Sequence, residues 1–525
     1  MDTIGNNVRV EEAVASRIEV DRQARTMERL SDVQTFYEKK NILITGATGF
    51  LGKVLMEKLL RRCQGLENLY ILVRQKRGQD IYSRVETVFE DPLFDRLKEE
   101  VPKFRHKVVV VQGDCDAAGL GLNITDRQML IEKVNVIFHS AATVKFDEHL
   151  RRALITNVRA TRTLVHLARE MTGLTAFMHI STAFGYPFLK YIDERVYPCN
   201  VDYDELQGLV DNMTDDEVDA YTDKVLDNKW PNTYTYTKAM TENELLKNSK
   251  NIPLCIFRPA IVSSTTEEPV KSWVDNMYGA TGVAAGCMTG VLRSLQCDPD
   301  KTAELVPVDY VVNCLLVASL HVANLYNTSS PSEPPVYNFV TAQGNKLTWN
   351  DFRVMNFKHI DLYPTTKAIW YRTLSLNRNY YVNLIYVLFL HTLPALLVDI
   401  VVVCLTQKPK MLKVYRKIHK FSAVLAYFST RQFKFSNEQT EQLWEHTSTL
   451  DKKLFPFDMR QLDWEEYFKE YLLGIRRFLL KEKDETIPQA RIKIKRLYYL
   501  HQLVLWAGML LLLYLLTVVM LPLVL

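Results

Sequence analysis

Residues 41–52, which read NILITGATGFLG, constrain the fold more strongly than any other part of the chain. A short apolar run typical of a β-strand is followed directly by glycines at positions 46, 49 and 52. A helix-like alternation of apolar and charged residues comes next. Strand, tight turn and helix in this order open a dinucleotide-binding βαβ unit, although the spacing is Gly-x-x-Gly-x-x-Gly rather than Gly-x-Gly-x-x-Gly. The alternative is a glycine-rich turn in an unrelated α/β protein.

The three glycines have separate expected tasks in such a unit. Gly46 takes the tight turn, Gly49 lets a pyrophosphate approach the backbone, and Gly52 lets the helix pack closely on the strand. The pyrophosphate would lie against the free N–H groups at the start of the helix. Three further residues of the turn are therefore expected at the cofactor: Thr48, Phe50 and Leu51.

Composition sets the broad class. A chain of 525 residues is too long for one core, and its net charge of +4 gives no sign of a nucleic-acid surface. The eight cysteines are scattered without a Cys-x-x-Cys pair, which fits a reducing compartment and argues against a disulfide framework or a metal site. The N-terminus has no apolar segment of the secretory type. We therefore expect neither nucleic acid nor metal as a partner.

Short apolar runs alternate with helical patterns through residues 36–350, as a Rossmann-type, doubly wound parallel sheet requires. Before them, residues 1–35 are polar and are expected to form a flexible extension. Residues 193–229 are acidic and lack a clear period, which indicates an insertion. The expected strands are 41–45, 68–73, 107–112, 134–139, 176–180, 254–258 and 336–340.

The end of the second strand indicates which cofactor binds. An NAD enzyme usually has a carboxylate here for the ribose 2′-hydroxyl, but this chain has the cations Arg74, Lys76 and Arg77. Cations can pair with the 2′-phosphate of NADP, and Arg74 can do so bidentately. The alternative is a solvated basic strand end. Later strand ends supply Asp114, for the adenine amino group, and a turn of small residues that permits close approach of the cofactor: Ser140, Ala141 and Ala142.

A catalytic constellation follows the fifth strand. Ser181 and Thr182 lie at its carboxyl end, where ligands bind in such sheets. Tyr234 and Lys238 are four residues apart and share one face of a helix, so the ammonium is expected to lower the pKa of the tyrosine. Such a tyrosine can protonate a carbonyl oxygen as hydride reaches the carbon, while Ser181 or Thr182 holds the oxyanion and Lys238 the nicotinamide ribose. The alternative is an exposed aromatic–cation pair.

Arg258 ends the sixth expected strand and has two interpretations. It can meet a cofactor or substrate phosphate, or it can form a structural ion pair.

Together these motifs resemble the extended short-chain dehydrogenase/reductase superfamily. Within it, residues 37–58, 139–148 and 231–238 resemble the fatty acyl-CoA reductases. The resemblance continues in residues 393–399, 408–410, 427–435 and 455–458, which are similar to that family's C-terminal domain, so it covers nearly all of residues 33–475. A sterol dehydrogenase or a sugar epimerase would not share this C-terminal set.

The resemblance implies that long-chain acyl-CoA is reduced by two NADPH to a primary alcohol and free CoA. It implies Tyr234 as the acid, Lys238 as its partner and Ser181 or Thr182 as the oxyanion ligand, with a slight preference for Thr182. One departure concerns Ser272, which stands where the family commonly has glycine. Serine adopts positive φ less freely than glycine, which places the shape of that loop in doubt.

Two apolar stretches point to a membrane. Residues 497–525 are long enough to span a bilayer and follow a basic flank, so they are expected to form a transmembrane helix with a cytosolic start. Residues 380–405, within an expected C-terminal domain of residues 351–490, precede a basic linker. We expect them to form a re-entrant or interfacial hairpin broken at Pro394, or a membrane-facing wall of an acyl tunnel. A true transmembrane helix is the competing interpretation.

Other functions remain open at this stage. One is a membrane-bound reductase of the same superfamily that stops at the aldehyde or uses another lipid carbonyl, and another is a non-catalytic NADP-binding membrane protein. The expected location is the endoplasmic reticulum membrane with the catalytic domain in the cytosol, with the peroxisomal membrane as the alternative. The sequence sets neither the oligomeric state nor the preferred acyl chain.

Overall fold

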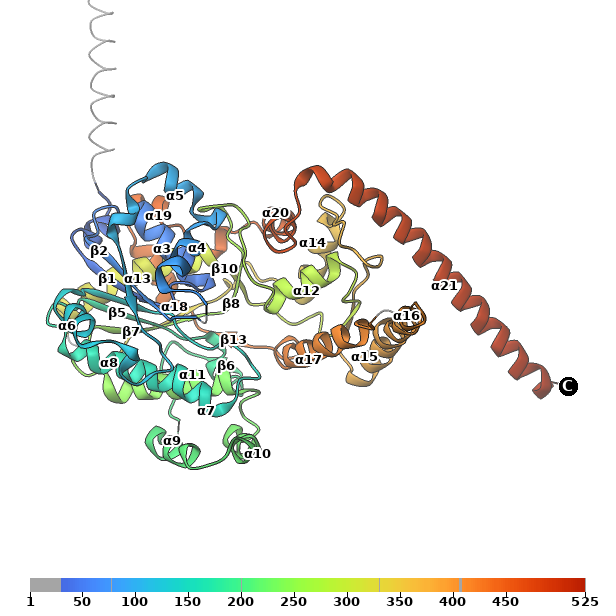
Figure 1. Cartoon of the computed structure of the whole chain (residues 1–525), viewed down its shortest axis with the longest axis horizontal. Coiled ribbons are helices and arrows are strands. Elements are labelled where there is room, and N and C mark those ends of the chain that lie inside the picture. The colour runs from blue at the N-terminus through green and yellow to red at the C-terminus, as the bar shows by residue number, and fades with distance from the viewer. Residues whose placement is uncertain (1–29, 77, 200, 330, 406–407, 525) are drawn as a thin grey trace, which may run out of the picture.

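A seven-stranded parallel sheet forms the centre of the molecule, which is described by a computed structural model over residues 30–76, 78–199, 201–329, 331–405 and 408–524 (Figure 1). The strand order is β11-β7-β5-β4-β1-β2-β3. The strands are β1 (Asn41–Thr45), β2 (Asn68–Val73), β3 (Val108–Gln112), β4 (Val136–His139), β5 (Ala176–Ile180), β7 (Leu254–Pro259) and β11 (Val336–Phe339). All seven expected strands are therefore confirmed, with bounds within two residues.

Helices cover both faces of the sheet, as a doubly wound fold requires. On one face α3 (Phe50–Arg62) packs against α13 (Val308–Thr328), and on the other α8 (Ala160–Glu170) packs against α11 (Thr233–Asn248). Each face has its own apolar core. Helix α13 is apolar and long enough to cross a membrane, but 72% of its apolar window is buried, so it is a core helix.

The position of β1 explains where a ligand can bind. Its neighbours are β2 on one side and β4 on the other. The sheet continues with β3 beyond β2 and with β5, β7 and β11 beyond β4, so the chain extends the sheet in opposite directions from β1. The connections that leave the carboxyl ends of β1 and β4 diverge to opposite faces and open a crevice between them.

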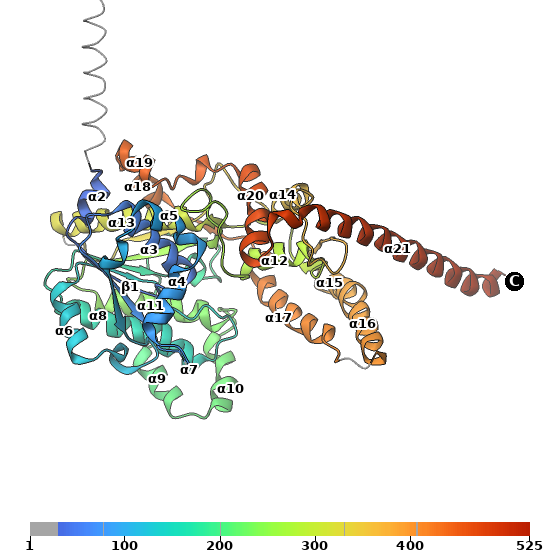
Figure 2. The same cartoon turned by 45° about the horizontal axis from the view of Figure 1, so that its top comes forward.

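Later parts of the chain pack beside the sheet and also directly against it. Helices α12 (Gly279–Met288), α14 (Trp349–His359) and α17 (Met411–Ser429) form a second layer beside the sheet (Figures 1 and 2). Further on, β13 (Lys434–Phe435) pairs with β6 (Tyr191–Ile192), and α18 (Glu438–His446) packs on β11. Segments after residue 350 therefore pack directly on the part of the chain that contains the sheet.

Ordered structure begins earlier than expected at the N-terminus. Helix α2 (Asp32–Tyr37) starts with a capping box between Ser31 and Gln34, and its Val33 and Tyr37 are buried. The expected flexible extension therefore ends before Ser31, and its first 29 residues lie outside the described part of the chain.

The acidic insertion is helical. Its two helices, α9 (Tyr203–Asp211) and α10 (Asp215–Leu226), project from the body at the bottom of Figure 1. Their apolar residues form a small cluster with Tyr236 and Met240 of α11, while their carboxylates stay on the exposed side. The buried positions are few, which explains why no helical period stands out in the sequence.

Residues 380–404 form one continuous helical segment and not a hairpin broken at Pro394. It comprises α15 (Tyr380–Val387), a π-helical turn η6 (Leu388–Thr392) and α16 (Leu393–Cys404). Pro394 lies in the first turn of α16, directly after the π-helical turn, where a missing N–H is tolerated. The chain reverses only after α16, and Asp399 accepts hydrogen bonds from the backbone N–H groups of Lys410, Met411 and Leu412 at the start of α17.

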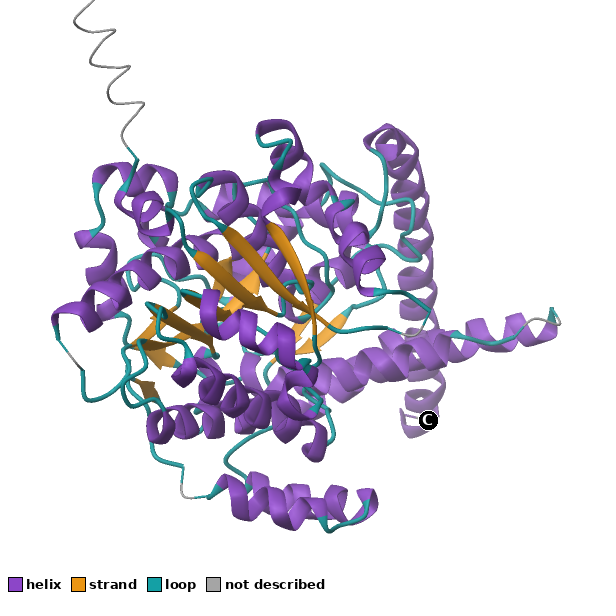
Figure 3. Cartoon of the chain, turned by 60° about the vertical axis from the view of Figure 1, so that its left-hand side comes forward, coloured by secondary structure: helices purple, strands orange, loops and turns teal. Residues whose placement is uncertain are grey.

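Two helical segments are apolar and exposed. Only 17% of the apolar window of Tyr380–Cys404 is buried, and none of that of Asp484–Val518, which includes most of α21 (Ile487–Val524). Figure 3 shows α21 leaving the body in a different direction from the paired α16 and α17. Both segments are long and apolar enough to cross a membrane and are compatible with membrane association.

The loop with Ser272 keeps a glycine-like conformation. Ser272 has a φ of +62°, so serine occupies the left-handed region that its side chain disfavours. The adjacent Trp273 stacks on Phe50 at 5.4 Å and donates a hydrogen bond to Asp91. The loop is thereby fixed against the start of α3.

Candidate active site

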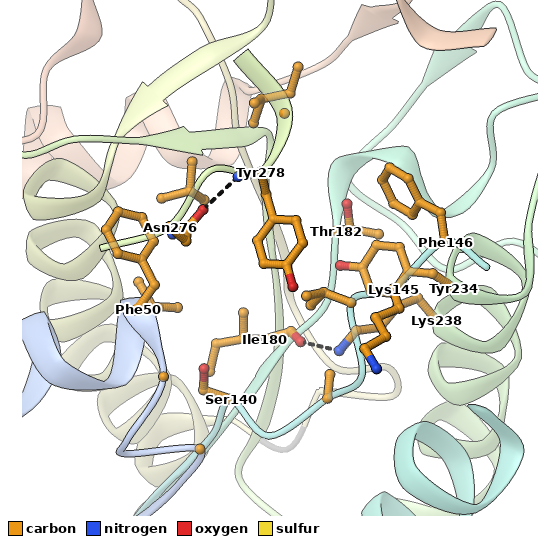
Figure 4. A pocket seen from close by; sticks show the side chains of 18 of the residues that line it. Phe50, Ser140, Lys145, Phe146, Ile180, Thr182, Tyr234, Lys238, Asn276 and Tyr278 are labelled. Atoms are coloured by element: carbon orange, nitrogen blue, oxygen red, sulfur yellow. Dashed lines mark hydrogen bonds between the residues drawn. The ribbon is translucent and has the colours of Figure 1, made fainter. Parts of the chain in front are cut away.

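A cavity of about 930 Å³ opens at the carboxyl ends of β1, β4 and β5. It extends from the turn after β1 to the second layer formed by α12 and α17. Figure 4 shows Tyr234, Lys238, Thr182 and Phe146 on one side, with Tyr278 reaching in from the loop before α12. Most of the predicted cofactor residues line it: Gly46, Thr48, Gly49, Phe50, Leu51, Arg74, Asp114, Ser140, Ala141 and Ala142.

The glycine turn has the shape that a pyrophosphate requires. Gly46 has a φ of +76°, and a Cβ there would lie 2.7 Å from the backbone nitrogen of Ala141. A Cβ on Gly52 would lie 2.3 Å from the carbonyl oxygen of Gly46, so Gly52 serves the helix packing and does not line the cavity. Gly49 caps α3 without any side-chain hydrogen bond, which leaves backbone donors free at the cavity. These features fit a dinucleotide.

Two arginines line the cavity beside the glycine turn. Arg74 lines it and pairs with Asp116 at 3.4 Å, whereas Lys76 is exposed and is not part of the lining. Arg77 lies outside the described residues. The second arginine is Arg84 of α4 (Ile81–Phe89), which donates to the Thr48 hydroxyl at 2.8 Å and to the carbonyl oxygen of Arg74.

Arg84 was not predicted from the sequence. Burial lowers its pKa, and the nearby charge of Arg74 lowers it further, so the two guanidinium groups repel each other and attract an anion. The signal in the sequence was its place in the first turn of a helix that Asp80 caps, close after the basic strand end.

Tyr234 and Lys238 lie on the first turns of α11, whose start is fixed by Asn232 as N-cap. Both line the cavity. The Lys238 ammonium donates to the carbonyl oxygen of Ile180 at 2.7 Å, and the Tyr234 hydroxyl lies on the same side of the cavity as Thr182, close enough for the Thr182 hydroxyl to affect its pKa. The helix and the end of β5 thus bring the three predicted catalytic side chains together.

The expected lowering of the Tyr234 pKa is wrong for this arrangement. Burial raises the pKa of Tyr234 to about 12, although the Thr182 hydroxyl lowers it in part. Burial also lowers the pKa of Lys238 to about 8, with Glu242 acting in the opposite direction. The ammonium bonds to a backbone carbonyl rather than to the phenol, so burial dominates the phenol's pKa. A protonated Tyr234 at neutral pH is the state that a proton donor needs.

Ser181 and Thr182 have different roles. The Ser181 hydroxyl donates to Glu242 at 2.5 Å, away from Tyr234. The Thr182 hydroxyl accepts the backbone N–H of Phe184 at 3.3 Å and meets Tyr234. Of the two candidates, Thr182 therefore has the geometry of an oxyanion ligand, and Ser181 fixes the end of the strand.

Arg258 is a structural residue. It is fully buried and pairs with Glu242 through contacts of 2.9 and 2.5 Å, and it also donates to the carbonyl oxygens of Asp193 and Arg195. Its guanidinium is occupied by these acceptors and does not line the cavity. The predicted cofactor contact of Arg258 is therefore wrong, and the ion-pair alternative is the one that the structure contains.

The far wall of the cavity comes from α17, which the sequence analysis did not include in the site. The ring centroid of Phe428 in this helix lies 5.7 Å from that of Phe146. The Phe146 ring centroid in turn lies 5.7 Å from that of Tyr234. No residue of the Tyr380–Cys404 segment lines the cavity, so the expected tunnel wall in that segment is wrong. Among the described residues no three His, Cys, Asp or Glu side chains are grouped as a metal site requires.

Comparisons with known proteins indicate the family of the chain. Two family models match, both described as "Male sterility protein", one named NAD_binding_4 over residues 44–315 and one named Sterile over residues 390–482. "Fatty acyl-CoA reductase wat" of Drosophila melanogaster is 40% identical over 472 residues, 90% of this chain and 90% of the relative. Human "Fatty acyl-CoA reductase 1" is 38% identical over 465 residues, 89% of each chain.

Solved structures share the fold. The terminal R domain from the myxalamid PKS-NRPS pathway has a TM-score of 0.56 at 19% identity and covers 84% of this chain and 91% of its own. The reductase domain of a nonribosomal peptide synthetase from Mycobacterium tuberculosis has the same TM-score and identity, with 84% and 93% covered.

The nucleotide turn, the grouping of Tyr234, Lys238 and Thr182, and relatives matching nine-tenths of the chain lead to one assignment. An NAD-binding family model over the sheet makes the cofactor a nicotinamide dinucleotide. The chain is an oxidoreductase and belongs to the fatty acyl-CoA reductase family of extended short-chain dehydrogenases/reductases.

Proposed function

We propose that this protein reduces long-chain fatty acyl-CoA to a primary alcohol and free CoA with two NADPH. The observation that carries the proposal is the meeting of Tyr234 and Thr182 inside a cavity with two unlike ends. One end has free backbone donors and two arginines, and the other is lined by aromatic and aliphatic side chains of α12 and α17. Relatives named fatty acyl-CoA reductase support the choice of substrate class.

The residues of the site assign the proton steps. A substrate oxygen placed beside the Tyr234 and Thr182 hydroxyls would accept a hydrogen bond from each, so both would stabilise the charge that develops there. Tyr234 then donates its proton to that oxygen, and Lys238 maintains positive charge on the same helix face. Bound NADPH supplies the hydride to the carbonyl carbon.

Reduction to the alcohol takes two such rounds. The first turns the thioester into a thiohemiacetal, whose C–S bond breaks to release the CoA thiol and leave an aldehyde. The second adds hydride to the aldehyde carbon and a proton from Tyr234 to its oxygen. Each alcohol therefore accounts for two hydrides, two protons and one thiol.

NADPH is preferred over NADH in this proposal because Arg74 and Arg84 both line the cavity and are next to each other, so their guanidinium groups could pair with a 2′-phosphate. Replacing Arg84 by alanine should reduce the ratio of kcat/KM for NADPH to that for NADH by about 10- to 100-fold, since a charge-assisted hydrogen bond contributes about 1.5–3 kcal/mol. Lys76→Ala is the matched control, because Lys76 is exposed and is not among the residues that line the cavity. An Arg84→Ala enzyme with unchanged selectivity would contradict the assignment.

The membrane is the proposed setting of the reaction. The apolar part of helix α21 follows basic residues in the first turns of the same helix, which favours a cytosolic start of a membrane-spanning tail: Arg491, Lys493, Lys495 and Arg496. An acyl chain partitions into lipid while its CoA remains in water. A site beside the bilayer can therefore take up the acyl-CoA at the interface and return the alcohol to the lipid. The endoplasmic reticulum membrane with a cytosolic catalytic part fits this arrangement, and the peroxisomal membrane is the alternative.

The proposal is tested by product analysis. Detergent-solubilised protein is given palmitoyl-CoA and NADPH, and the lipid products are resolved by mass spectrometry. Hexadecanol that disappears in Tyr234→Phe is the expected result. Hexadecanal as the end product would restrict the activity to a two-electron reduction, and no turnover across chain lengths with NADPH still bound would overturn the assigned substrate.

A further inference from the structure

Helix α17 presents two kinds of side chain to the cavity. Its lining residues follow a helical spacing, so they form one stripe along the helix. The stripe is cationic at the N-terminal end and apolar toward the C-terminal end: Lys417, Lys420, Phe421, Val424, Leu425 and Phe428. Lys413 and Arg416, near the start of the helix, are exposed like Lys417 and Lys420 but do not line the cavity.

The apolar end of the stripe lies beside the chemistry. Phe428 is linked to Tyr234 through the ring of Phe146, with centroid separations of 5.7 Å in each step. Lys417 is eleven residues before Phe428, which at 1.5 Å per residue is about 16 Å along the helix. This separation is comparable with an extended pantetheine arm, which separates the thioester carbonyl of an acyl-CoA from its first phosphate.

A third lysine faces the stripe. Lys145, from the loop after β4, lines the cavity and is exposed, and the same loop reaches α17 through the ion pair between Asp147 and Lys420 at 2.7 Å. Within the described part of the chain, the ammonium groups of Lys145 and Lys417 have neither an ion pair nor a hydrogen bond. Asp147 therefore neutralises Lys420 and is also near Lys145, and Lys417 adds a further charge to the same lining, which leaves net positive charge beside an apolar interior.

We infer that Lys145, Lys417 and Lys420 bind the phosphates of the CoA moiety, so that the mouth between α17 and the loop after β4 is the CoA end of the substrate site. This inference rests on the proposed function and deepens it. The thioester carbonyl then meets Tyr234 and Thr182, and the acyl chain continues into the apolar end lined by Val283, Leu295 and Trp349. The phosphates of NADPH do not compete, because Arg74 and Arg84 hold the other nucleotide end.

A lipid headgroup is the other anion that such lysines can meet. All four of these cations are exposed, but only Lys417 and Lys420 also line the cavity, which favours CoA, whereas Lys413 and Arg416 lie outside the lining and suit a headgroup. Replacing Lys413 and Arg416 removes the same charge from the same helix as replacing Lys417 and Lys420. The two double variants are therefore matched and differ only in position.

The test compares two substrates in each variant. Lys417→Gln with Lys420→Gln is assayed with palmitoyl-CoA and with hexadecanal, which lacks CoA but needs the same Tyr234. The ratio of kcat/KM for palmitoyl-CoA to that for hexadecanal should fall about tenfold or more, because two charge-assisted contacts are lost. The fall should come from a higher KM for palmitoyl-CoA. Lys145→Gln, which leaves α17 and its ion pair with Asp147 intact, should lower the ratio to a smaller extent. Lys413→Gln with Arg416→Gln should leave the ratio unchanged.

Two outcomes overturn the inference. A parallel loss with both substrates would make the lysines structural, and an unchanged ratio would place the phosphates elsewhere. Flotation with phosphatidylserine vesicles is run beside the assay, and a loss of vesicle binding in the Lys417/Lys420 variant without a change in the ratio would assign the lysines to lipid. Calorimetric titration with CoA alone keeps the site testable if palmitoyl-CoA is not turned over: tight binding lost in the variant supports the site while the proposed function fails.

Discussion

Thr182 and Ser181 are neighbours in the sequence, but only Thr182 has its hydroxyl beside Tyr234. Thr182→Val keeps the size of the side chain and should lower kcat by about 10²-fold or more, as expected for the loss of one oxyanion ligand. Ser181→Ala should lower kcat less than tenfold and instead lower the melting temperature, because its hydroxyl holds Glu242. Steady-state kinetics and thermal unfolding of the two variants check this, and equal losses of kcat would contradict the assignment.

The protonation of Lys238 sets a second expectation at this scale. Burial lowers its pKa to about 8, so the ammonium is present below that pH and is lost above it, while Tyr234, with a pKa of about 12, stays protonated. We expect kcat/KM to be highest below pH 8 and to fall as pH rises through it. Lys238→Arg should retain part of the activity and lose this alkaline fall, since a guanidinium stays charged. A flat profile of the wild type up to pH 10 would contradict the role.

Individual residues were predictable from sequence where a motif defines both their type and their spacing. The glycine turn and the Tyr234–Lys238 pair fall in this class. Arg258 does not, because a strand-end arginine can face a ligand or a buried carboxylate, and only the fold brings Glu242 to it. Arg84 was missed for the converse reason, since a cation on an amphipathic helix carries no signal of what lies opposite.

At the scale of elements, the turn between β1 and α3 depends on contacts that leave no space for a side chain. Gly52→Ala should abolish cofactor binding and destabilise the protein, because its Cβ would lie 2.3 Å from the Gly46 carbonyl oxygen. Gly208→Ala in α9 is the matched control, since nothing lies within 4 Å of its Cβ, and alanine should stabilise that helix by about 0.5–1 kcal/mol. NADPH titration by fluorescence and thermal unfolding separate the two, and a Gly52→Ala protein that binds NADPH normally would refute the packing argument.

Strands were easier to predict than the helices that complete the site. Each sheet strand is a short apolar run, and burial of both faces of a parallel sheet produces that pattern wherever the strand lies. The stripe of α17 is also regular, but a cationic and apolar face is equally consistent with a membrane surface or a protein core. Its partner across the cavity, the loop with Phe146, is distant in sequence, so only the folded chain reveals the wall.

At the scale of the whole molecule, the two exposed apolar segments are expected to contribute differently to membrane binding. The apolar part of α21 is exposed from Leu503 to Val518, and just before it the His501 ring accepts a hydrogen bond from the indole N–H of Trp370 at 3.2 Å. A chain ending at Gln502 keeps that contact and removes the tail. It should change from carbonate-resistant to carbonate-extractable while still binding vesicles through α15 and α16, whose apolar side chains are exposed.

Leu397→Glu with Val401→Glu, at 63% and 57% exposed positions of α16, should then release the shortened chain from vesicles. Carbonate extraction and flotation measure both steps. A shortened chain that resists carbonate would show that Tyr380–Cys404 spans the bilayer by itself.

The most direct test of the central claim is the ratio of NADPH oxidised to CoA thiol released during turnover of palmitoyl-CoA by the solubilised protein. NADPH is followed by its absorbance and the thiol by a colorimetric reagent in the same reaction. A ratio of two, with hexadecanol as the product and both signals lost in Tyr234→Phe, is the predicted result. A ratio of one with hexadecanal accumulating, or turnover that survives in Tyr234→Phe, would contradict the account of one site that carries out both reductions.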